Sequence, residues 1–340
     1  MLAFCNDYSE GCHPTVLKRL IDTNMLELPG YGSDDYSVAA RQRIAEACHL
    51  PQAEVFLLSG GTQTNLIVIA SLLRSYEGVI CCSTGHIAVH EAGAIEATGH
   101  KVLTIPAKEG KLNAVDLEAY LVDFQKNASR EHMVQPGMVY ISQPTEYGTL
   151  YSKKELKGLH DVCKRNGLPL FVDGARLAYA LACPENDVSL PDLSKLCDVF
   201  YFGGTKAGLL CGEAVVFPQG APGHYLTFIK QHGALLAKGR LLGVQFDALF
   251  TDKLYLNIGK NAIVQADRIR AALKAKGYPF AIASPTNQIF VVLDAAKKQA
   301  LAQQVWFDLW DNLPDGRTVI RLCTSWATTS EAVDQLIALL

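Results

Sequence analysis

Three short segments place chemically useful side chains directly after apolar runs that are typical of strands. They are SGGTQTN (59–65), FVDGAR (171–176) and YFGGTKAG (201–208). Ligands of open α/β sheets bind at the carboxyl ends of the strands, so we expect the three segments to meet at one site. Their residue types indicate an anion cradle, a buried carboxylate and a reactive amine.

The first segment has the composition of an anion cradle. Gly61, Thr62 and Thr64 open an apolar stretch of helical character. Small residues let the backbone approach an anion, and a helix N-terminus supplies free N–H groups and a favourable dipole. The segment is neither a Walker A loop nor GxGxxG, so it indicates a phosphate without indicating a nucleotide. The alternative is a plain helix N-cap with turn glycines.

The other two segments carry one charged group each. Asp173 ends an apolar run, where an unpaired carboxylate is costly, so its partner is either Arg176 or a protonated heterocycle of a ligand. Lys206 follows a strand and two glycines. A partly desolvated lysine has a lowered pKa and can form a Schiff base, although a surface lysine in a turn has the same pattern. A phosphate cradle, a carboxylate and an imine-forming lysine together match pyridoxal 5'-phosphate.

Two histidines and a glutamate lie after another apolar run, in STGHIAVHEAGA. His86 could stack on a cofactor ring. His86, His90 and Glu91 have the spacing HxxxHE, which differs from HExxH and lacks an evident third ligand, so we expect no metal. His132, which precedes a later strand-like run, is either a loop histidine or a site residue. Arg321 is either a strand-edge arginine or a bidentate partner for an amino acid carboxylate.

The elements that must position these residues alternate between strands and helices. The apolar runs lie at 55–59, 78–82, 101–105, 138–142, 168–172, 198–202 and 213–217, with helical segments at 64–76, 114–126, 153–166 and 192–196. Continuous apolar runs are typical of strands buried on both faces, so the pattern predicts an α/β domain with a mostly parallel sheet covered by helices.

A different pattern follows Phe217. It predicts helices at 224–250 and 251–276, strands at 287–293 and 319–323, a helix near 297–311 and a closing helix from Thr329. We therefore expect an N-terminal arm at 1–30 with a helix at 15–23. A large domain at 31–248 and a small C-terminal α+β domain at 249–340 complete the expected organisation.

Composition narrows the possible functions. The chain has 340 residues, a net charge of -3 and no Lys/Arg run, which argues against nucleic acid as a partner. The longest apolar runs, such as 66–73, are shorter than the roughly 20 residues of a bilayer span. The first residues resemble no secretory signal, and the ten cysteines form no CxxC pair. We expect free thiols and a cytoplasmic location.

Six segments resemble the low-specificity L-threonine aldolases, a β-eliminating lyase group with the aspartate-aminotransferase fold (fold type I of the pyridoxal-phosphate enzymes). The segments are YGSDDYSVAARQRIAE, SGGTQTNL, GHIAVHEAGA, LPLFVDGARL, FGGTKAG and IRLCTSWATTSE. The resemblance covers essentially the whole chain. It implies cleavage of L-threonine, L-allo-threonine and related β-hydroxy-α-amino acids to glycine and an aldehyde.

The resemblance also implies roles for the cofactor-binding residues. Lys206 would form the Schiff base, Asp173 would pair with the pyridinium nitrogen and His86 would stack on the ring. Gly61 and Thr62 would bind the phosphate. Family members are mostly homotetramers built from dimers, and Lys238 and Arg240 match a basic segment that reaches the phosphate across the dimer interface.

For the substrate, the resemblance implies that Arg321 binds the carboxylate and that Arg176 contacts the cofactor or the substrate. His132 matches a histidine that approaches the substrate hydroxyl. Three positions depart from the family pattern: Asn6 stands where Ser helps to bind the carboxylate, Thr205 where Ser precedes the lysine, and His90 where many relatives have an aromatic residue. An amide can still donate to a carboxylate.

The mechanism expected from these residues is a retro-aldol cleavage. Arg321 and Asn6 would hold the carboxylate so that the Cα–Cβ bond stands perpendicular to the cofactor ring. The base for the β-hydroxyl proton would be His86, His132 or a water between them. Other pyridoxal-phosphate reactions on the same scaffold (β-elimination or transamination), a catalytically silent binding protein and a zinc enzyme built on His86 and His90 are the alternatives.

Overall fold

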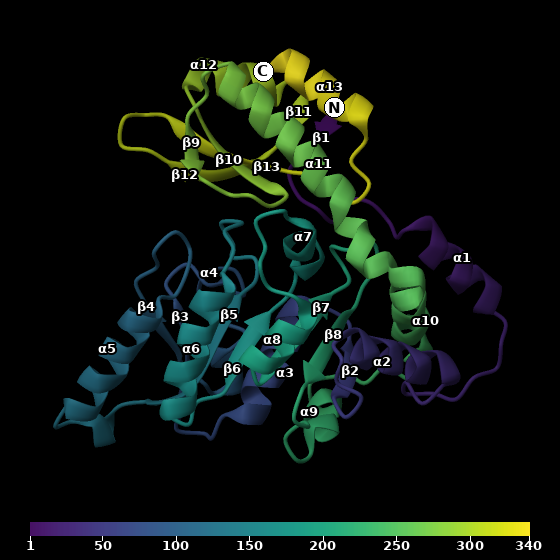
Figure 1. Ribbon diagram of the computed structural model, residues 1–340, viewed down its shortest axis with the longest axis vertical. Helices are drawn as coiled ribbons and strands as arrows, with labels where there is room; N and C mark the ends of the chain where they lie inside the picture. Colours follow the sequence, from purple (N-terminus) through teal and green to yellow (C-terminus); the bar gives the residue numbers. More distant parts are fainter.

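A seven-stranded sheet forms the centre of the larger part of the molecule (Figure 1). The computed structural model describes residues 1–340. The strand order is β2-β8-β7-β6-β5-β3-β4. The strands are β2 (Glu54–Leu58), β3 (Glu77–Cys82), β4 (Val102–Ile105), β5 (Gln135–Ser142), β6 (Leu170–Asp173), β7 (Val199–Gly203) and β8 (Glu213–Phe217). All seven strands predicted from the sequence are confirmed, with ends that differ by at most a few residues.

The direction of the strands brings the predicted segments to one edge of the sheet. Neighbouring strands from β4 to β7 are parallel, whereas β8 is antiparallel to both β7 and β2. Because β8 is reversed, its first residue, Glu213, pairs with Leu58 at the end of β2 and with Gly203 at the end of β7. The carboxyl ends of β2, β3, β5, β6 and β7 therefore share an edge with the start of β8.

Helices cover both faces of this sheet, which explains the continuous apolar runs. One face packs against α5 (Ala114–Lys126), α6 (Lys153–Arg165) and α8 (Leu190–Leu196), and the other packs against α3 (Gly61–Leu72) and α9 (Tyr225–Gln231). Within β6, for example, Val172 belongs to the first core and Phe171 to the second. The remaining helices of this part are α2 (Asp35–Ala47), α4 (His86–Val89), α7 (Leu177–Ala182), α10 (Arg240–Phe250), η1 (Glu96–Thr98), η2 (Arg130–His132) and η3 (Thr251–Lys253).

The C-terminal part has its own four-stranded antiparallel sheet of order β12-β13-β10-β9. Its elements are α11 (Leu254–Ala275), β9 (Phe280–Ile282), β10 (Gln288–Leu293), α12 (Ala295–Ala302), β11 (Val305–Trp306), β12 (Asp308–Asn312), β13 (Thr318–Cys323) and α13 (Ser330–Leu339). The 22-residue helix α11 runs from this sheet down to α10 and the larger part (Figure 1). None of the helices combines the length and the apolar character that a membrane span requires.

Two predicted helices are wrong. The stretch 224–250 contains two helices, because α9 ends at Gln231 and the chain turns through Gly233, whose φ is +69°. The helix predicted near 297–311 ends at Ala302, and the apolar residues beyond it form β11 and β12 instead. Pairing of β12 with β13 supplies the backbone hydrogen bonds that a helix would otherwise supply. Helix α2 was not predicted; its N-cap Asp34 accepts a hydrogen bond from the Ser37 N–H at 2.9 Å.

The N-terminal residues connect the two parts of the molecule. β1 (Leu2–Ala3) pairs in parallel with β11, and Phe4 is buried in the core of the C-terminal part. The chain then passes the carboxyl edge of the large sheet and enters α1 (Pro14–Thr23), which packs against α10. The domain boundaries at 30/31 and 248/249 stay predictions; the second one falls inside α10.

Candidate active site

Asp173, the last residue of β6, is a buried carboxylate without a cationic side-chain partner. Tyr140 on β5 donates to its Oδ2 at 2.6 Å, and Tyr201 on β7 donates to its Oδ1 at 2.5 Å. Asn65 and the backbone N–H of Ala175 donate at 3.1 and 2.9 Å. Burial opposes ionisation, but nearby His86 and these hydrogen bonds outweigh it, so the pKa of Asp173 is lower than usual. Both neighbouring strands therefore hold the carboxylate ionised.

Two glycines allow the ends of β6 and β7 to approach each other. A Cβ atom on Gly174 would lie 1.9 Å from the carbonyl oxygen of Tyr201, and one on Gly203 would lie 2.2 Å from that of Ala175. Both contacts are with backbone atoms, which cannot move aside as a flexible side chain can. The close approach places the β7 end, with Lys206 three residues beyond it, beside Asp173.

Lys206 lies in this edge among several charges. Desolvation and the positive charge of Arg176 lower the pKa of its amine, although Asp7, Asp173 and Glu213 partly compensate. The phenol of Tyr8 lies under the amine, with Nζ 6.0 Å from the ring centre. A lysine with a lowered pKa is a better nucleophile at neutral pH. The sequence prediction that Lys206 and Asp173 meet at one edge agrees with this placement.

Glu213 fixes the turn that carries Lys206. It accepts hydrogen bonds from the Thr205 hydroxyl at 2.8 Å and from the Gly204 N–H at 3.1 Å. Thr205 Oγ1 in turn accepts from the Gly212 N–H at 3.1 Å. Burial raises the pKa of Glu213 to about 8. The sequence analysis did not find this residue, although an acidic residue opening a fully apolar strand was the signal for it.

The N-terminus of α3 lies at the same edge. Its N-cap, Gly60, provides no side-chain cap, so the first N–H groups, those of Gly61 and Thr62, have no partner within the helix. Gly61 lies beside Tyr201, since a Cβ there would be 3.4 Å from the tyrosine hydroxyl. Thr64 differs from the prediction: it is fully buried, and its hydroxyl is closed to solvent and makes no hydrogen bond. The first turn therefore offers backbone donors rather than the Thr64 side chain.

Arg176 does not pair with Asp173, which removes one of the two partners weighed from the sequence. Its guanidinium donates to the Asp7 carboxylate through Nε at 2.7 Å and through Nη2 at 3.0 Å. Asn287 also donates to Asp7 at 2.9 Å. Burial works against the charge on Asp7, but Arg176 and Lys206 lower its pKa to about 2. Asp7 was missed because it lies 169 residues from its partner.

His86 begins α4 and is held from both sides by buried carboxyl groups. Its Nδ1 lies 2.7 Å from Glu91 Oε1, and its backbone N–H donates to Glu146 Oε1 at 3.0 Å. Ser142, at the end of β5, donates to the same Glu146 oxygen at 2.6 Å. Burial raises the pKa of Glu146. The imidazole of His86 is 32% exposed, so one side of it remains open to a ligand.

Arg321 on β13 lies at the entrance from the C-terminal part. It donates to Gln288 at 2.9 Å and to Asp308 at 2.9 Å, and its guanidinium lies 5.1 Å from the ring centre of Trp310. Its Nη2 also reaches the carbonyl oxygen of Cys5 at 3.4 Å, beside Asn6. Arg321 Nε is closed to solvent and has no hydrogen-bond partner. The contacts through Nη1 and Nη2 therefore fix the guanidinium.

Asn6 lies next to these groups on the N-terminal segment. Its Oδ1 accepts from the Tyr8 N–H and the Ser9 hydroxyl, both at 2.9 Å. Its Nδ2 contacts only Cys5 Sγ, at 3.4 Å. The turn thus orients the side chain and leaves the amide N–H groups available as donors.

Three predicted site residues lie away from this edge. His132 precedes β5, whereas the site lies at its carboxyl end; eight residues at ~3.3 Å each separate the two ends by about 26 Å. The exposed His132 therefore does not reach the site within one chain. Arg240 donates to the Leu26 carbonyl at 2.5 Å and also to the Thr23 carbonyl, at the end of α1, and Lys238 is exposed nearby.

His90 faces an aromatic group rather than a set of metal ligands. Its ring centre lies 5.6 Å from that of His86 and 6.1 Å from that of Trp310. Trp310 packs edge-on against Phe290 at 4.9 Å and Tyr147 at 5.7 Å. No group of three or more His, Cys, Asp or Glu side chains in the structure has metal-ligating geometry.

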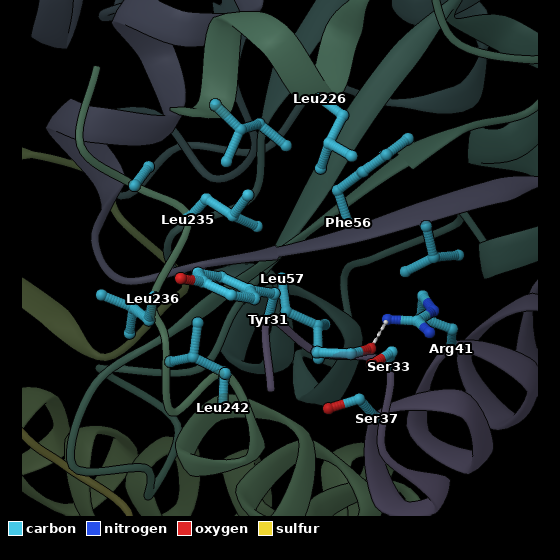
Figure 2. Close-up of a pocket in the computed structure, with 15 residues that line it drawn as sticks. Tyr31, Ser33, Ser37, Arg41, Phe56, Leu57, Leu226, Leu235, Leu236 and Leu242 are labelled. Atoms are coloured by element: carbon cyan, nitrogen blue, oxygen red, sulfur yellow. Dashed lines mark hydrogen bonds between the residues drawn. The ribbon is translucent and has the colours of Figure 1, made fainter. Parts of the chain in front are cut away.

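The pocket in Figure 2 lies apart from this cluster and has a volume of about 240 Å³. Leu226, Leu235 and Leu242 give it an apolar wall, and Tyr31 points into it. Arg41, its one charged lining residue, donates to the Gly32 carbonyl at 2.9 Å. None of the titratable residues at the carboxyl edge of the sheet lines this pocket, so it contains no candidate catalytic group from that edge.

Comparisons with known proteins place the chain in a class. Aspartate aminotransferase from Thermus thermophilus superposes with a TM-score of 0.71 over 100% of this chain and 90% of that one, at 14% identity, which shows the fold alone. The chain belongs to the beta-eliminating lyase family, whose sequence pattern matches residues 16–299. The fold and the family expected from the sequence are thereby confirmed.

Within the family, three similar proteins carry one activity in their names. The low specificity L-threonine aldolase of Pseudomonas aeruginosa is 30% identical, over 98% of this chain and 95% of that protein. The enzyme of the same name from Saccharomyces cerevisiae is 24% identical, over 78% and 68%. The solved threonine aldolase of Leishmania major has a TM-score of 0.96 and 44% identity, over 100% of this chain and 98% of that one.

Proposed function

We propose that this chain is a pyridoxal-phosphate-dependent aldolase that cleaves L-threonine, L-allo-threonine and related β-hydroxy-α-amino acids to glycine and an aldehyde. One observation carries the proposal. Lys206, with its lowered pKa, lies at the same sheet edge as the ionised, buried Asp173. The 44% identity to the Leishmania major threonine aldolase over the full chain supports the choice of reaction.

The residues at this edge fit the cofactor. Asp173 is buried, ionised and without a cationic side-chain partner, which suits a protonated ring nitrogen. The uncapped N–H groups of Gly61 and Thr62 suit a phosphate, and Lys206 would hold the cofactor covalently through its amine. A carboxylate has about four acceptor sites, and four donors already bind Asp173. We expect the ring nitrogen to replace Asn65, which at 3.1 Å makes the longest of the four contacts.

When bound, pyridoxal phosphate supplies an aromatic ring that accepts the electron pair left on the substrate Cα as the Cα–Cβ bond breaks. The two tyrosines on Asp173 keep that carboxylate in place. The open side of the His86 imidazole would face the ring. Arg176, paired with Asp7, would supply positive charge near the cofactor.

The substrate carboxylate would bind at Arg321 and Asn6. Arg321 Nη2 reaches the carbonyl oxygen of Cys5, the residue next to Asn6, at 3.4 Å, so the two side chains lie in the same region. Asp308 holds one guanidinium nitrogen in the absence of substrate, so we expect the substrate carboxylate to compete with it. Fixing the carboxylate orients the Cα–Cβ bond, and this orientation decides which bond breaks.

His86 would take the proton from the β-hydroxyl group. Of the two histidines expected from the sequence, it alone lies at the carboxyl edge of the sheet. An imidazole has two ring nitrogens, one of which can accept a proton and later return it, so histidine is the most common general base. Glu146 accepts a hydrogen bond from the His86 backbone N–H at 3.0 Å.

The test uses Lys206→Ala with added pyridoxal phosphate. We expect loss of the visible absorption of the lysine-bound cofactor and of aldehyde release from threonine. Lys195→Ala, which removes an exposed lysine on α8, is the matched control and should behave as the wild type. Aldehyde release by Lys206→Ala at the wild-type rate refutes the proposal.

The products distinguish the alternatives. Glycine and an aldehyde support the aldolase, pyruvate and ammonia support a β-eliminating lyase, and a keto acid with the aminated cofactor supports an aminotransferase. A catalytically silent binding protein would release none of these. The fold alone does not decide among them, since all of these activities occur on it.

The assembly and location form the last part of the proposal. We infer a homotetramer built from two dimers, with Lys238 and Arg240 near a subunit interface. Exposed apolar residues of α1 and the segment after it, Leu17, Ile21, Met25 and Leu26, support a contact surface there. A cytoplasmic location is supported by ten free cysteines, because reducing compartments keep thiols free. Light scattering of the purified protein measures the subunit number.

A further inference from the structure

Glu91 is buried directly beside the ring of His86. Its side chain has no exposed surface, and its Oε1 lies 2.7 Å from His86 Nδ1. The same oxygen accepts a hydrogen bond from Asn65 Nδ2 at 2.6 Å. Glu91 Oε2 makes no hydrogen bond at all. One oxygen of a buried carboxylate therefore receives both available donors.

This arrangement decides which ring nitrogen of His86 carries the proton. Asn65 must present its NH₂ group, because its Nδ2 faces a carboxylate oxygen on Glu91 and another on Asp173. Glu91 Oε1 therefore already accepts a hydrogen bond from Asn65. If Oε1 also carried a proton, two donors would face each other. Nδ1 of His86 must then donate. In the neutral ring Nε2 becomes the acceptor, and no side chain or backbone group of the structure occupies it.

Asn65 also joins His86 to the carboxylate expected under the cofactor ring. Its amide nitrogen bridges Glu91 at 2.6 Å and Asp173 at 3.1 Å. Asn65 is in the first turns of α3, which begins at the predicted phosphate cradle. A displacement of Asn65 from Asp173 by the ring nitrogen would leave its shorter bond to Glu91 in place.

We propose that Glu91 and Asn65 are positioning residues that fix His86 in the tautomer with a proton on Nδ1, so that Nε2 faces the reacting hydroxyl group as a base. This inference rests on the proposed aldolase function for its catalytic consequence. Its structural part, the protonation of Nδ1, does not depend on that function. A carboxylate in this position orients the imidazole and stabilises its protonated form.

The first experiment compares Glu91→Gln with the wild type in the cofactor-loaded enzyme. We expect kcat for aldehyde release to fall about 100-fold, with KM changed less than about twofold and cofactor absorption unchanged. The acidic limb of the pH profile should move to lower pH, because a neutral amide stabilises the imidazolium less. The other titratable groups facing His86 are Glu146, Asp173 and His90. The matched control is Glu96→Gln, an exposed glutamate five residues on, which should leave both quantities unchanged.

The second experiment reads the tautomer directly in the apoprotein labelled with ¹⁵N-histidine. We expect a protonated Nδ1 and an unprotonated Nε2 for His86, assigned by loss of its signals in His86→Asn. Wild-type signals with the proton on Nε2 overturn the inference, whether or not Glu91→Gln folds. A folded Glu91→Gln enzyme with wild-type kcat and pH profile also overturns it. If the wild type binds cofactor but releases no aldehyde from threonine, the proposed function fails, while an Nδ1–H signal of His86 in the wild type still supports the positioning by Glu91.

Discussion

Arg176 and Asp7 form a buried two-point ion pair, with N···O distances of 2.7 and 3.0 Å, that links the large sheet to the N-terminal segment. The arginine lies just beyond β6 and the aspartate just beyond β1, so 169 residues separate them. The pair brings Asp7, and with it the neighbouring Asn6, to the edge that carries Lys206. The N-terminal segment is therefore part of the site.

Replacing Asp7 with Asn should lower the free energy of unfolding by about 3–5 kcal/mol, because Arg176 would stay buried without a counter-charge. Urea denaturation of the apoprotein measures this. The control is Asp22→Asn, which removes an exposed partner of Lys18 and should cost less than about 0.5 kcal/mol. Equal stability of Asp7→Asn and the wild type would contradict a structural role for the pair.

The same pair predicts a pH dependence. The pKa of Asp7 is about 2 in the folded protein and 3.8 in the reference state. A depressed carboxyl pKa stabilises the fold at any pH above 3.8, and this stabilisation is lost as the pH falls through about 2. The difference in stability between the wild type and Asp7→Asn should shrink over that range.

Glu213 predicts the opposite pH trend. Its pKa is about 8 in the folded protein against a reference value of 4.5. A raised carboxyl pKa favours the folded state fully below 4.5, and this contribution is lost as the pH rises through about 8. Melting temperatures of apoprotein should therefore fall more for the wild type than for Glu213→Gln between about pH 5 and pH 9. The exposed Glu96→Gln variant should keep the wild-type slope; parallel curves for Glu213→Gln would show that Glu213 does not titrate in this range.

Asp308→Asn should lower the KM for threonine. Asp308 holds Arg321 at 2.9 Å, and its side chain is 42% exposed, so it is a weak internal competitor of the substrate carboxylate. Exposed pairs contribute about 0.2–1 kcal/mol, which corresponds to a KM reduction of up to about fivefold. Steady-state kinetics measure it, with Asp311→Asn on the same strand as control. A higher KM in Asp308→Asn would mean that Asp308 orients Arg321 for the substrate.

The two histidines should differ sharply in substitution experiments. His132→Ala should retain kcat within about twofold, because His132 is exposed at the opposite end of β5. His86→Ala should reduce kcat about 100-fold or more, as loss of a general base does. Aldehyde release at saturating threonine measures both. A large loss in His132→Ala alone would indicate that a second subunit brings this residue to the site.

The sequence predicted the sheet well because its strands are buried on both faces. Residues 138–141, for example, are apolar at every position, and no exposed helix has that pattern. It failed for β12, where leucine and tryptophan residues are compatible with either a helix or a strand. The pairing of Asp308–Asn312 with β13 decides between them, and such pairing is not visible locally.

The site was predictable where a residue ends a strand and unpredictable where its partner is distant. Lys206 and Asp173 follow strands that run in the same direction, so their meeting follows from the topology. The sequence analysis put His132 at the site, but His132 precedes β5. A residue before a parallel strand lies at the edge opposite to the carboxyl ends. The tyrosines beside Asp173 were missed because a tyrosine in an apolar strand is usually a core residue.

The tyrosine hydroxyls that clamp Asp173 come from β5 and β7, the two strands on either side of it. Regular backbone pairing therefore sets where the anion sits, and no flexible connection intervenes. Substitutions in connections and edge strands, such as those at Tyr147 and Trp310, would therefore leave the position of the Asp173 carboxylate unchanged.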